Sequence, residues 1–170
     1  MFLNLIREFF VKKSLKNDSN DDKKEVFTKN VQTIGLLIDE SNFKYTKELK
    51  EELILKGIVE QNIKVIVFRG KISNTEVYSF PVFGKNHIDW KGNIKNSFVS
   101  EFVETEFDLL ISYYDFENPI LMMLTNLSKA KFKVGFSSIG KKINRWMINT
   151  DLGNYKIFVS ELFKYLKNIK

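Results

Sequence analysis

The sequence contains no cysteine, which excludes disulfide bonds, cysteine-ligated zinc, iron–sulfur clusters and thiol catalysis. Because His87 is the only histidine, we expect no metal site. Two prolines and eight glycines are too few for a collagen-like or linker-dominated chain. No apolar run approaches the ~20 residues that a membrane-spanning helix needs. A cysteine-free chain suits a reducing compartment, so we expect a cytoplasmic location.

Signature motifs of cofactor binding are also missing. The sequence has neither GxGxxG nor GxxxxGK[ST], the glycine-rich patterns that cradle dinucleotides and nucleoside triphosphates. It also lacks GxSxG, the nucleophile elbow of serine hydrolases. We therefore expect no cofactor, and the lack of a complete catalytic set favours a protein that is not an enzyme.

What the sequence does contain is enough apolar material for one core. Its 170 residues are 44% hydrophobic and include sixteen phenylalanines, most of which must be buried. We divide the chain into an N-terminal amphipathic helix (1–16), a flexible polar linker (17–30) and a single α/β domain (31–170). Residues 2–16 carry large apolar side chains at helical spacing, namely Phe2, Leu3, Leu5, Ile6, Phe9 and Phe10. This helix could dock on its own domain, on a partner or, as a peripheral contact, on a membrane surface.

Strand and helix patterns alternate along the domain. Apolar runs predict strands at 33–39, 63–68, 107–113 and 132–136, with an edge strand at 77–83 limited by Pro81. Helical spacing predicts helices at 46–57, 94–104, 119–128 and 155–169, the third capped by Asn118. The pattern predicts a Rossmann-like, open, mostly parallel sheet with helices on both faces. It does not give the order of the strands.

Two resemblances rest on particular stretches. Residues 107–136, FDLLISYYDFENPILMMLTNLSKAKFKVGF, resemble the N-terminal domain of heptosyltransferase-type GT-B glycosyltransferases, which implies half of a two-domain enzyme without its donor-sugar domain. With FPVFGKNHIDWKG at 80–92, residues 31–169 also resemble a short bacterial family known only as a domain of unknown function. The first resemblance implies a fold, and the second implies no activity.

Ligands of open α/β sheets bind beyond the carboxyl ends of the strands. Eight residues follow those ends and are candidates for ligand binding: Asp39, Glu40, Arg69, Tyr113, Tyr114, Asp115, Ser137 and Ser138. Acids beside aromatic rings suit a sugar or a cation, whereas serines with nearby lysines suit a phosphate. The alternative is that Asp39 and Asp115 cap turns or helices. For His87, we expect a structural role in anchoring its loop.

The last quarter of the chain is strongly basic. Residues 129–170 carry ten basic and two acidic side chains, a net charge of +8. Six residues form the candidate polyanion-binding set: Lys129, Lys131, Lys133, Lys141, Lys142 and Arg145. Aromatic residues lie among them, and basic groups with aromatic rings suit nucleic acid. The alternative is an ordinary lysine-rich surface.

The sequence therefore favours a non-catalytic, Rossmann-like binding module for an unidentified protein or small-molecule ligand. One alternative is an RNA- or ribosome-associated protein that uses the basic quarter. Another is a small enzyme acting on a phosphorylated or sugar-like ligand.

Overall fold

The computed structural model describes residues 30–89, 91–140 and 143–169. Its strands are β1 (Ile34–Asp39), β2 (Ile63–Phe68), β3 (Val82–Phe83), β4 (Leu109–Tyr113), β5 (Phe132–Phe136) and β6 (Trp146–Ile148). Its helices are α2 (Thr46–Leu55), α3 (Ser97–Glu104), α4 (Pro119–Leu127) and α5 (Tyr155–Asn168), with short 3-10 turns η1 (Glu60–Asn62) and η2 (Lys85–His87). The predicted helix at 2–16 and linker at 17–30 lie outside the described residues.

The six strands form one sheet in which every pair is parallel. Their order is β3-β2-β1-β4-β5-β6, the strand order of the dinucleotide-binding Rossmann fold. All side chains of β1 and β4 are buried, as expected of central strands covered on both faces. The predicted α/β fold is thus confirmed, and the structure adds the strand order.

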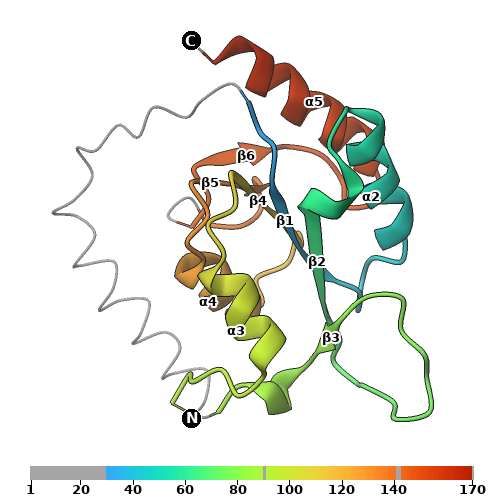
Figure 1. Cartoon of the computed structure of the whole chain (residues 1–170), viewed down its shortest axis with the longest axis vertical. Coiled ribbons are helices and arrows are strands. Elements are labelled where there is room, and N and C mark those ends of the chain that lie inside the picture. The colour runs from blue at the N-terminus through green and yellow to red at the C-terminus, as the bar shows by residue number, and fades with distance from the viewer. Residues whose placement is uncertain (1–29, 90, 141–142, 170) are drawn as a thin grey trace, which may run out of the picture.

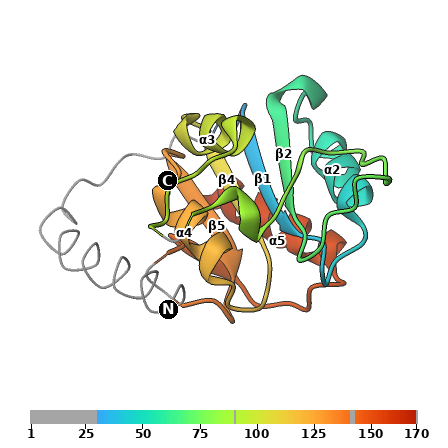
Figure 2. The ribbon, with the colours of Figure 1, turned by 90° about the horizontal axis from the view of Figure 1, so that it is seen from below.

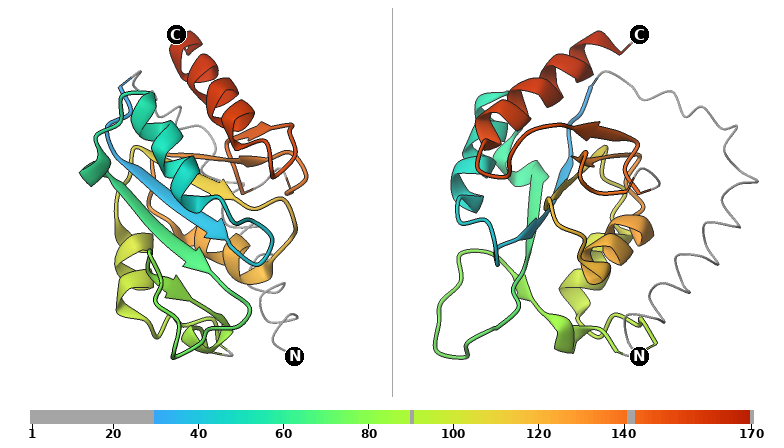
Figure 3. Two further views of the ribbon diagram at one scale, coloured as in Figure 1. Left: turned by 90° about the vertical axis from the view of Figure 1, so that its right-hand side faces the viewer. Right: turned by 180° about the vertical axis from the view of Figure 1, so that it is seen from behind.

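Two helices cover each face of the sheet (Figures 1 and 2). Helices α2 and α5 lie side by side on one face, as the views in Figure 3 show, and α3 and α4 cover the other. Successive side chains of β4 alternate between these faces: the ring of Tyr113 contacts Phe158 of α5, whereas Ser112 bonds Thr125 of α4. The chain therefore buries a core on both sides of the sheet.

Close packing on the α3 side depends on a glycine in β1. A Cβ atom on Gly35 would lie 2.6 Å from Cδ2 of Phe107 and 3.0 Å from Cζ of Phe102. Those two rings contact each other at a centroid distance of 5.0 Å. Gly35 thus lets the phenylalanines lie directly against the central strand.

The helix starts follow their capping residues. Asn118 Oδ1 accepts hydrogen bonds from the backbone N–H of Ile120 and Leu121, and Pro119 occupies the first turn, as predicted. Helix α3 was predicted from Ile94 but begins at Ser97, because Asn96 is extended and its side chain caps the helix. Ile94 instead forms an isolated antiparallel bridge with Ile88.

Both edge strands differ from the prediction. Residues 77–83 contribute only the two-residue β3, in line with the restriction that Pro81 imposes. Residues 146–148 were not predicted as a strand, yet they form β6 and pair with β5 from Val134↔Trp146 to Phe136↔Ile148. No helix separates β5 from β6 in the described residues.

Candidate functional site

The strand order reverses between β1 and β4. From β1 the chain continues to β2 on one side, whereas from β4 it continues to β5 on the other side. In doubly wound sheets the crevice beyond the carboxyl ends of these two strands is the usual ligand site. The predicted ligand-binding residues either end a strand, as Asp39 and Tyr113 do, or follow one at this edge.

Aromatic side chains form a buried cluster at the carboxyl end of β4, next to the position expected for this crevice. The ring of Tyr113, at the end of β4, lies 4.6 Å from Phe43, 4.9 Å from Phe136 and 5.0 Å from Phe158, measured between centroids. All four side chains are buried. Burial, with further contributions from the nearby Asp115 and Tyr155, raises the pKa of Tyr113, and its hydroxyl donates to the carbonyl of Leu152 at 2.6 Å.

Tyr114 lies on the opposite face and is also part of the core. Its hydroxyl is 2.9 Å from Oγ1 of Thr125, which in turn is 3.0 Å from Oγ of Ser112. All three residues are buried, and burial raises the pKa of Tyr114. The predicted neighbours Tyr113 and Tyr114 thus point into two separate parts of the core.

Asp39 stabilises the turn that follows β1. Its Oδ1 accepts the N–H of Ser41 at 2.9 Å, and its carbonyl accepts the N–H of Phe43. The residue is only 6% exposed. These contacts agree with the alternative expected from the sequence, in which Asp39 caps a turn.

Glu40 and Arg69 meet beyond β1 and β2. Both Nε and Nη2 of Arg69 donate to Oε2 of Glu40, at 3.0 and 2.8 Å, and Nη1 donates to Glu76 at 2.9 Å. The guanidinium carbon also lies 4.6 Å from the ring centroid of Tyr78. Burial disfavours the charged guanidinium, but the two carboxylates outweigh it and raise the pKa of Arg69.

A hollow of about 170 Å³ lies beside this ion-pair cluster and is lined by Glu40, Arg69, Tyr78, Thr46 and Lys44, among others. Thr46 donates its hydroxyl to Oε1 of Glu40 at 2.7 Å. Two carboxylates neutralise Arg69, so that an anion in the hollow would have to be attracted by Lys44, which donates to the backbone carbonyl of Glu40, and by Lys47. The size of the hollow suits a small polar molecule rather than a nucleotide-sugar.

The remaining predicted rim residues tie loops together. Ser138 donates to the carbonyl of Asp115 at 2.7 Å, which links the loops after β4 and β5. Ser137 donates to Oδ1 of Asn149 at 3.2 Å. The structure thus gathers the candidates into two groups, Glu40 with Arg69 and Asp115 with Ser138, separated by the aromatic cluster.

The six predicted polyanion-binding residues do not form one patch in the described part of the chain. Lys129 pairs with Glu104, and Lys131 pairs with Asp108 at 2.8 Å, both at the amino edge of β5. Lys133 donates to the carbonyl of Asn126 at 3.1 Å. Arg145 is exposed just before β6, and Lys141 and Lys142 lie outside the described residues.

The loop of His87 is held by local hydrogen bonds. Nδ1 of His87 accepts the N–H of Gly84 at 3.3 Å, and Asp89 accepts hydrogen bonds from Lys91 and Asn93. Bonds to Asn93 lower the pKa of Asp89. These contacts match the structural role predicted for His87. Within the described residues, no three histidine or acidic side chains come together as metal ligands.

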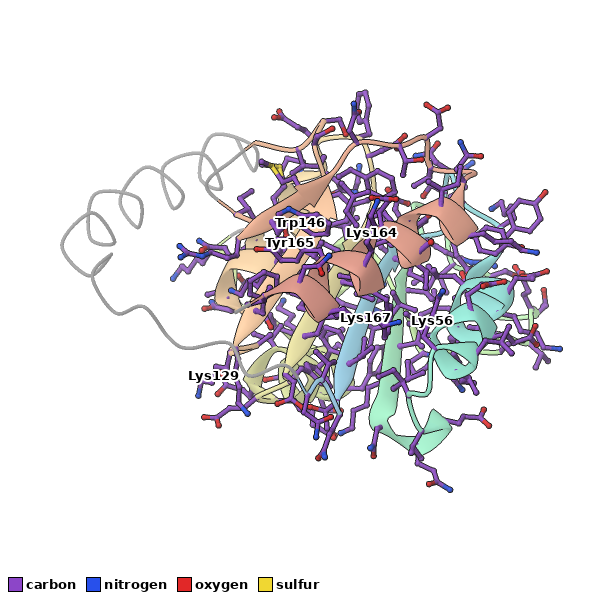
Figure 4. The ribbon with its side chains drawn as sticks, turned by 90° about the horizontal axis from the view of Figure 1, so that it is seen from above. Lys56, Lys129, Trp146, Lys164, Tyr165 and Lys167 are labelled. Atoms are coloured by element: carbon purple, nitrogen blue, oxygen red, sulfur yellow. The ribbon has the colours of Figure 1, made fainter. Side chains whose placement is uncertain are left out.

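A basic surface that the sequence analysis missed lies over α5. Figure 4 shows Lys56, Lys164 and Lys167 on the same side of the molecule as Trp146 and Tyr165. The rings of Trp146 and Tyr165 stack at 3.9 Å with an interplanar angle of 9°. Phe132 stacks on the same Tyr165 at 6.2 Å. The sequence did carry one indication of this surface. Lys164 and Lys167 are three residues apart and lie opposite the apolar stripe of α5, so they share one exposed side of the helix.

Fold and site together define a Rossmann-type α/β domain in which buried aromatic side chains surround Tyr113 at the carboxyl end of β4. The chain belongs to DUF6913, a family of unknown function, whose model matches residues 7–169. No curated protein and no solved structure matches it. The resemblance of residues 107–136 to glycosyltransferases therefore stays a prediction. None of the described helices is long and apolar enough to cross a membrane.

Proposed function

We propose that this domain is a non-catalytic binding module that uses the Rossmann architecture as a scaffold. The observation that carries the proposal is the cluster of Phe43, Tyr113, Phe136 and Phe158 at the switch point between β1 and β4. A nucleotide could enter there only after these buried rings had moved. Displacing even one such ring from the core costs about 3–5 kcal/mol, judged by Phe→Ala substitutions.

The polar groups around this cluster support the same proposal. The hydroxyl of Tyr113 is bonded to Leu152, and the charge of Arg69 is balanced by Glu40 and Glu76. A general acid or base needs a free position facing its substrate, and a phosphate clamp needs an unpaired cation. These side chains instead have structural partners. On this proposal, the resemblance of residues 107–136 to a GT-B glycosyltransferase concerns the fold of the domain and not the glycosyl-transfer reaction.

Incubation with nucleotide ligands tests whether the domain binds a nucleotide or catalyses hydrolysis of a nucleotide-sugar. We expect NADH and UDP-glucose, each at millimolar concentration, to leave the thermal unfolding temperature unchanged, because a ligand that binds the folded state would raise it. We also expect no release of UDP or glucose over hours. Turnover of UDP-glucose that is lost in Glu40→Gln or Arg69→Gln would overturn the proposal.

Binding of single-stranded RNA is a second candidate, favoured by the basic aromatic surface over α5. Among the described residues no carboxylate pairs with Lys56 or Lys167, and Lys164 has only a loose contact with Glu161 at 3.7 Å. Trp146 and Tyr165 are half-buried beside these cations. Because Tyr165 stacks on both Trp146 and Phe132, Trp146 is the ring of this stack that is proposed to receive a base. Cations that neutralise phosphates and rings that stack on bases are the two features that single-strand binding uses.

Fluorescence anisotropy with a labelled 20-nucleotide oligouridylate tests this candidate. We expect affinity to fall steeply with salt, and Lys164→Glu/Lys167→Glu to flatten the log–log salt slope by about 1.4, or ~0.7 per lost phosphate contact. Lys71→Glu/Lys85→Glu is the matched control, because both lysines are exposed near the opposite edge strand and the charge change is the same. Equal loss in both variants, or no binding at low salt, would exclude this surface.

A further inference from the structure

Strand β2 has an open edge along most of its length. It has six residues, but β3 pairs with only its last two, Val67↔Val82 and Phe68↔Phe83. The N–H of Val67 donates to the carbonyl of Pro81, on the side away from β1. Backbone groups two residues apart point the same way, so the N–H and C=O of Val65 also face outward. No described residue pairs with them.

An apolar groove runs along this open edge. Its volume is about 340 Å³, and its walls include Phe80 and Pro81 before β3, and Phe98 and Phe102 of α3. Phe98 and Phe80 are half-buried, and Pro81 is exposed. The groove therefore presents apolar surface to solvent along the stretch of β2 where the outward N–H and C=O of Val65 have no partner among the described residues.

The charges around the groove are already paired. Lys64 bonds Glu101 at 2.8 Å, and Lys50 bonds Glu60 at 2.9 Å. A charged partner would find no unpaired countercharge among these four side chains. The groove thus favours an apolar occupant, and natural proteins commonly cover such an edge with a helix or a loop.

We propose that the apolar face of residues 2–16 covers this groove in the same molecule. The segment supplies six large apolar side chains at helical spacing, which need a surface to bury them. The match to the family model begins at residue 7, so ten of the fifteen residues of the segment belong to the same family unit as the sheet. This inference concerns a different face from the proposed function and does not depend on it.

The place where the described chain begins supports an intramolecular contact. The N–H groups of Gln32 and Thr33 donate to Asp108, which fixes the entry of the chain at the amino edge of the sheet. The first residue of β1, Ile34, pairs with Ile63 of β2, one strand spacing of ~4.8 Å away. The groove lies along β2 from this same residue. A 14-residue linker at 17–30 reaches up to ~45 Å, far more than needed.

Paramagnetic relaxation in the full-length chain tests the proposal. Since the protein has no cysteine, Ser14→Cys places a single nitroxide at the end of the segment. We expect the label to remove the amide NMR signals of residues 63–66 and 97–102 and to preserve those of 155–167 on α5. Preserved signals at 63–66 and 97–102 would overturn the proposal.

Three further samples identify the segment that occupies the groove. Phe9→Ser/Phe10→Ser should restore the lost signals, whereas Glu8→Ser/Lys12→Ser, outside the apolar stripe at helical spacing, should leave them suppressed. A mixture of spin-labelled chain without ¹⁵N and ¹⁵N-labelled chain without the nitroxide should show no loss. Signal loss in that mixture would assign the groove to the segment of a second copy and would contradict the intramolecular contact.

Discussion

At the scale of single residues, Gly135 and Asn144 form the tightest contact described on the α4 side of the sheet. Asn144 is 5% exposed, and neither its Oδ1 nor its Nδ2 has a hydrogen-bond partner among the described residues. A Cβ atom on Gly135 would lie 2.3 Å from that Nδ2 and 2.9 Å from Cγ. Real Cβ atoms do not approach so closely, so a side chain at 135 must displace the amide.

Gly135→Ala is therefore expected to destabilise the protein by about 1–3 kcal/mol, the usual cost of overpacking. In an Asn144→Ala background the methyl group has room, and the loss should shrink by at least about 1 kcal/mol. Urea denaturation of the wild type, both single variants and the double variant measures this coupling. An equal loss in both backgrounds would show that the steric contact is not the cause.

Asp108 makes the free energy of unfolding depend on pH in the acid range. Burial acts to raise its pKa, but hydrogen bonds from Lys131, Gln32 and Thr33 outweigh burial and lower the pKa to about 2. A lowered native pKa stabilises the fold above the unfolded value of about 3.9, and this contribution disappears as pH falls through about 2. We expect about 2 kcal/mol from this carboxylate.

Denaturation at pH 6, 4, 3 and 2 tests this contribution. Asp108→Asn should be less stable than wild type at pH 6, and the difference should decrease between pH 4 and pH 2. A difference that is independent of pH would indicate that the amide disturbs packing rather than removing a charge.

The candidate site could be predicted only in part at this scale. The rule that ligands sit beyond strand ends brought Glu40 and Arg69 together correctly, because each follows one of two adjacent parallel strands. The same rule selected Tyr113 and Tyr114, which are core residues. Which ring fills a crevice depends on Phe43 and Phe158, and their positions follow from the tertiary arrangement of a loop and a distant helix.

At the scale of secondary structure, the start of α4 rests on one side chain. Asn118 caps the two free N–H groups of Ile120 and Leu121, and α4 buries five of its nine residues. Asn118→Ala should cost about 1 kcal/mol, whereas Asn118→Asp should retain most of the stability because aspartate caps equally well. Thermal unfolding distinguishes them, and equal losses for both variants would contradict the capping role.

The boundaries of the helices and strands show which of these elements could be predicted from the sequence. Continuous apolar runs identified the four strands that are covered on both faces, and the Asn-Pro pair identified the start of α4. Strand β6 was missed because it has three residues, of which Trp146 and Met147 are half-buried, so neither length nor alternation marks it. The order of the strands was beyond the sequence because parallel neighbours are joined through crossovers that give no local signal.

At the scale of the whole molecule, α5 completes one of the two core layers. Phe158, Val159, Leu162 and Leu166 are buried, and Phe158 contacts Tyr113 and Phe136 of the sheet. Burying these four side chains contributes about 6–12 kcal/mol at ~1.5–3 kcal/mol each, which is comparable with the entire stability of a small domain.

Truncation after Asn154 should therefore abolish the folded state, seen as loss of dispersed amide signals in a ¹H–¹⁵N spectrum. Deletion of residues 2–16 is the comparison, since it removes a segment of similar length but no part of the described sheet. We expect the dispersed spectrum to survive that deletion. A folded spectrum from the chain truncated after Asn154 would contradict the importance assigned to α5.

The parallel pairing of β1 with β4 has a consequence for how the protein is made. The bonded residues Thr33 and Asp108 are separated by 75 positions, and every bond between these strands spans a similar length of chain. At about 5–20 residues per second, a ribosome makes β1 about 4–15 seconds before β4. During that interval the apolar strand β1 (IGLLID) lacks β4, so β2 is the only one of its two neighbouring strands that is available for pairing. Nascent chains of this protein should therefore need shielding by a chaperone until the second half of the sheet emerges.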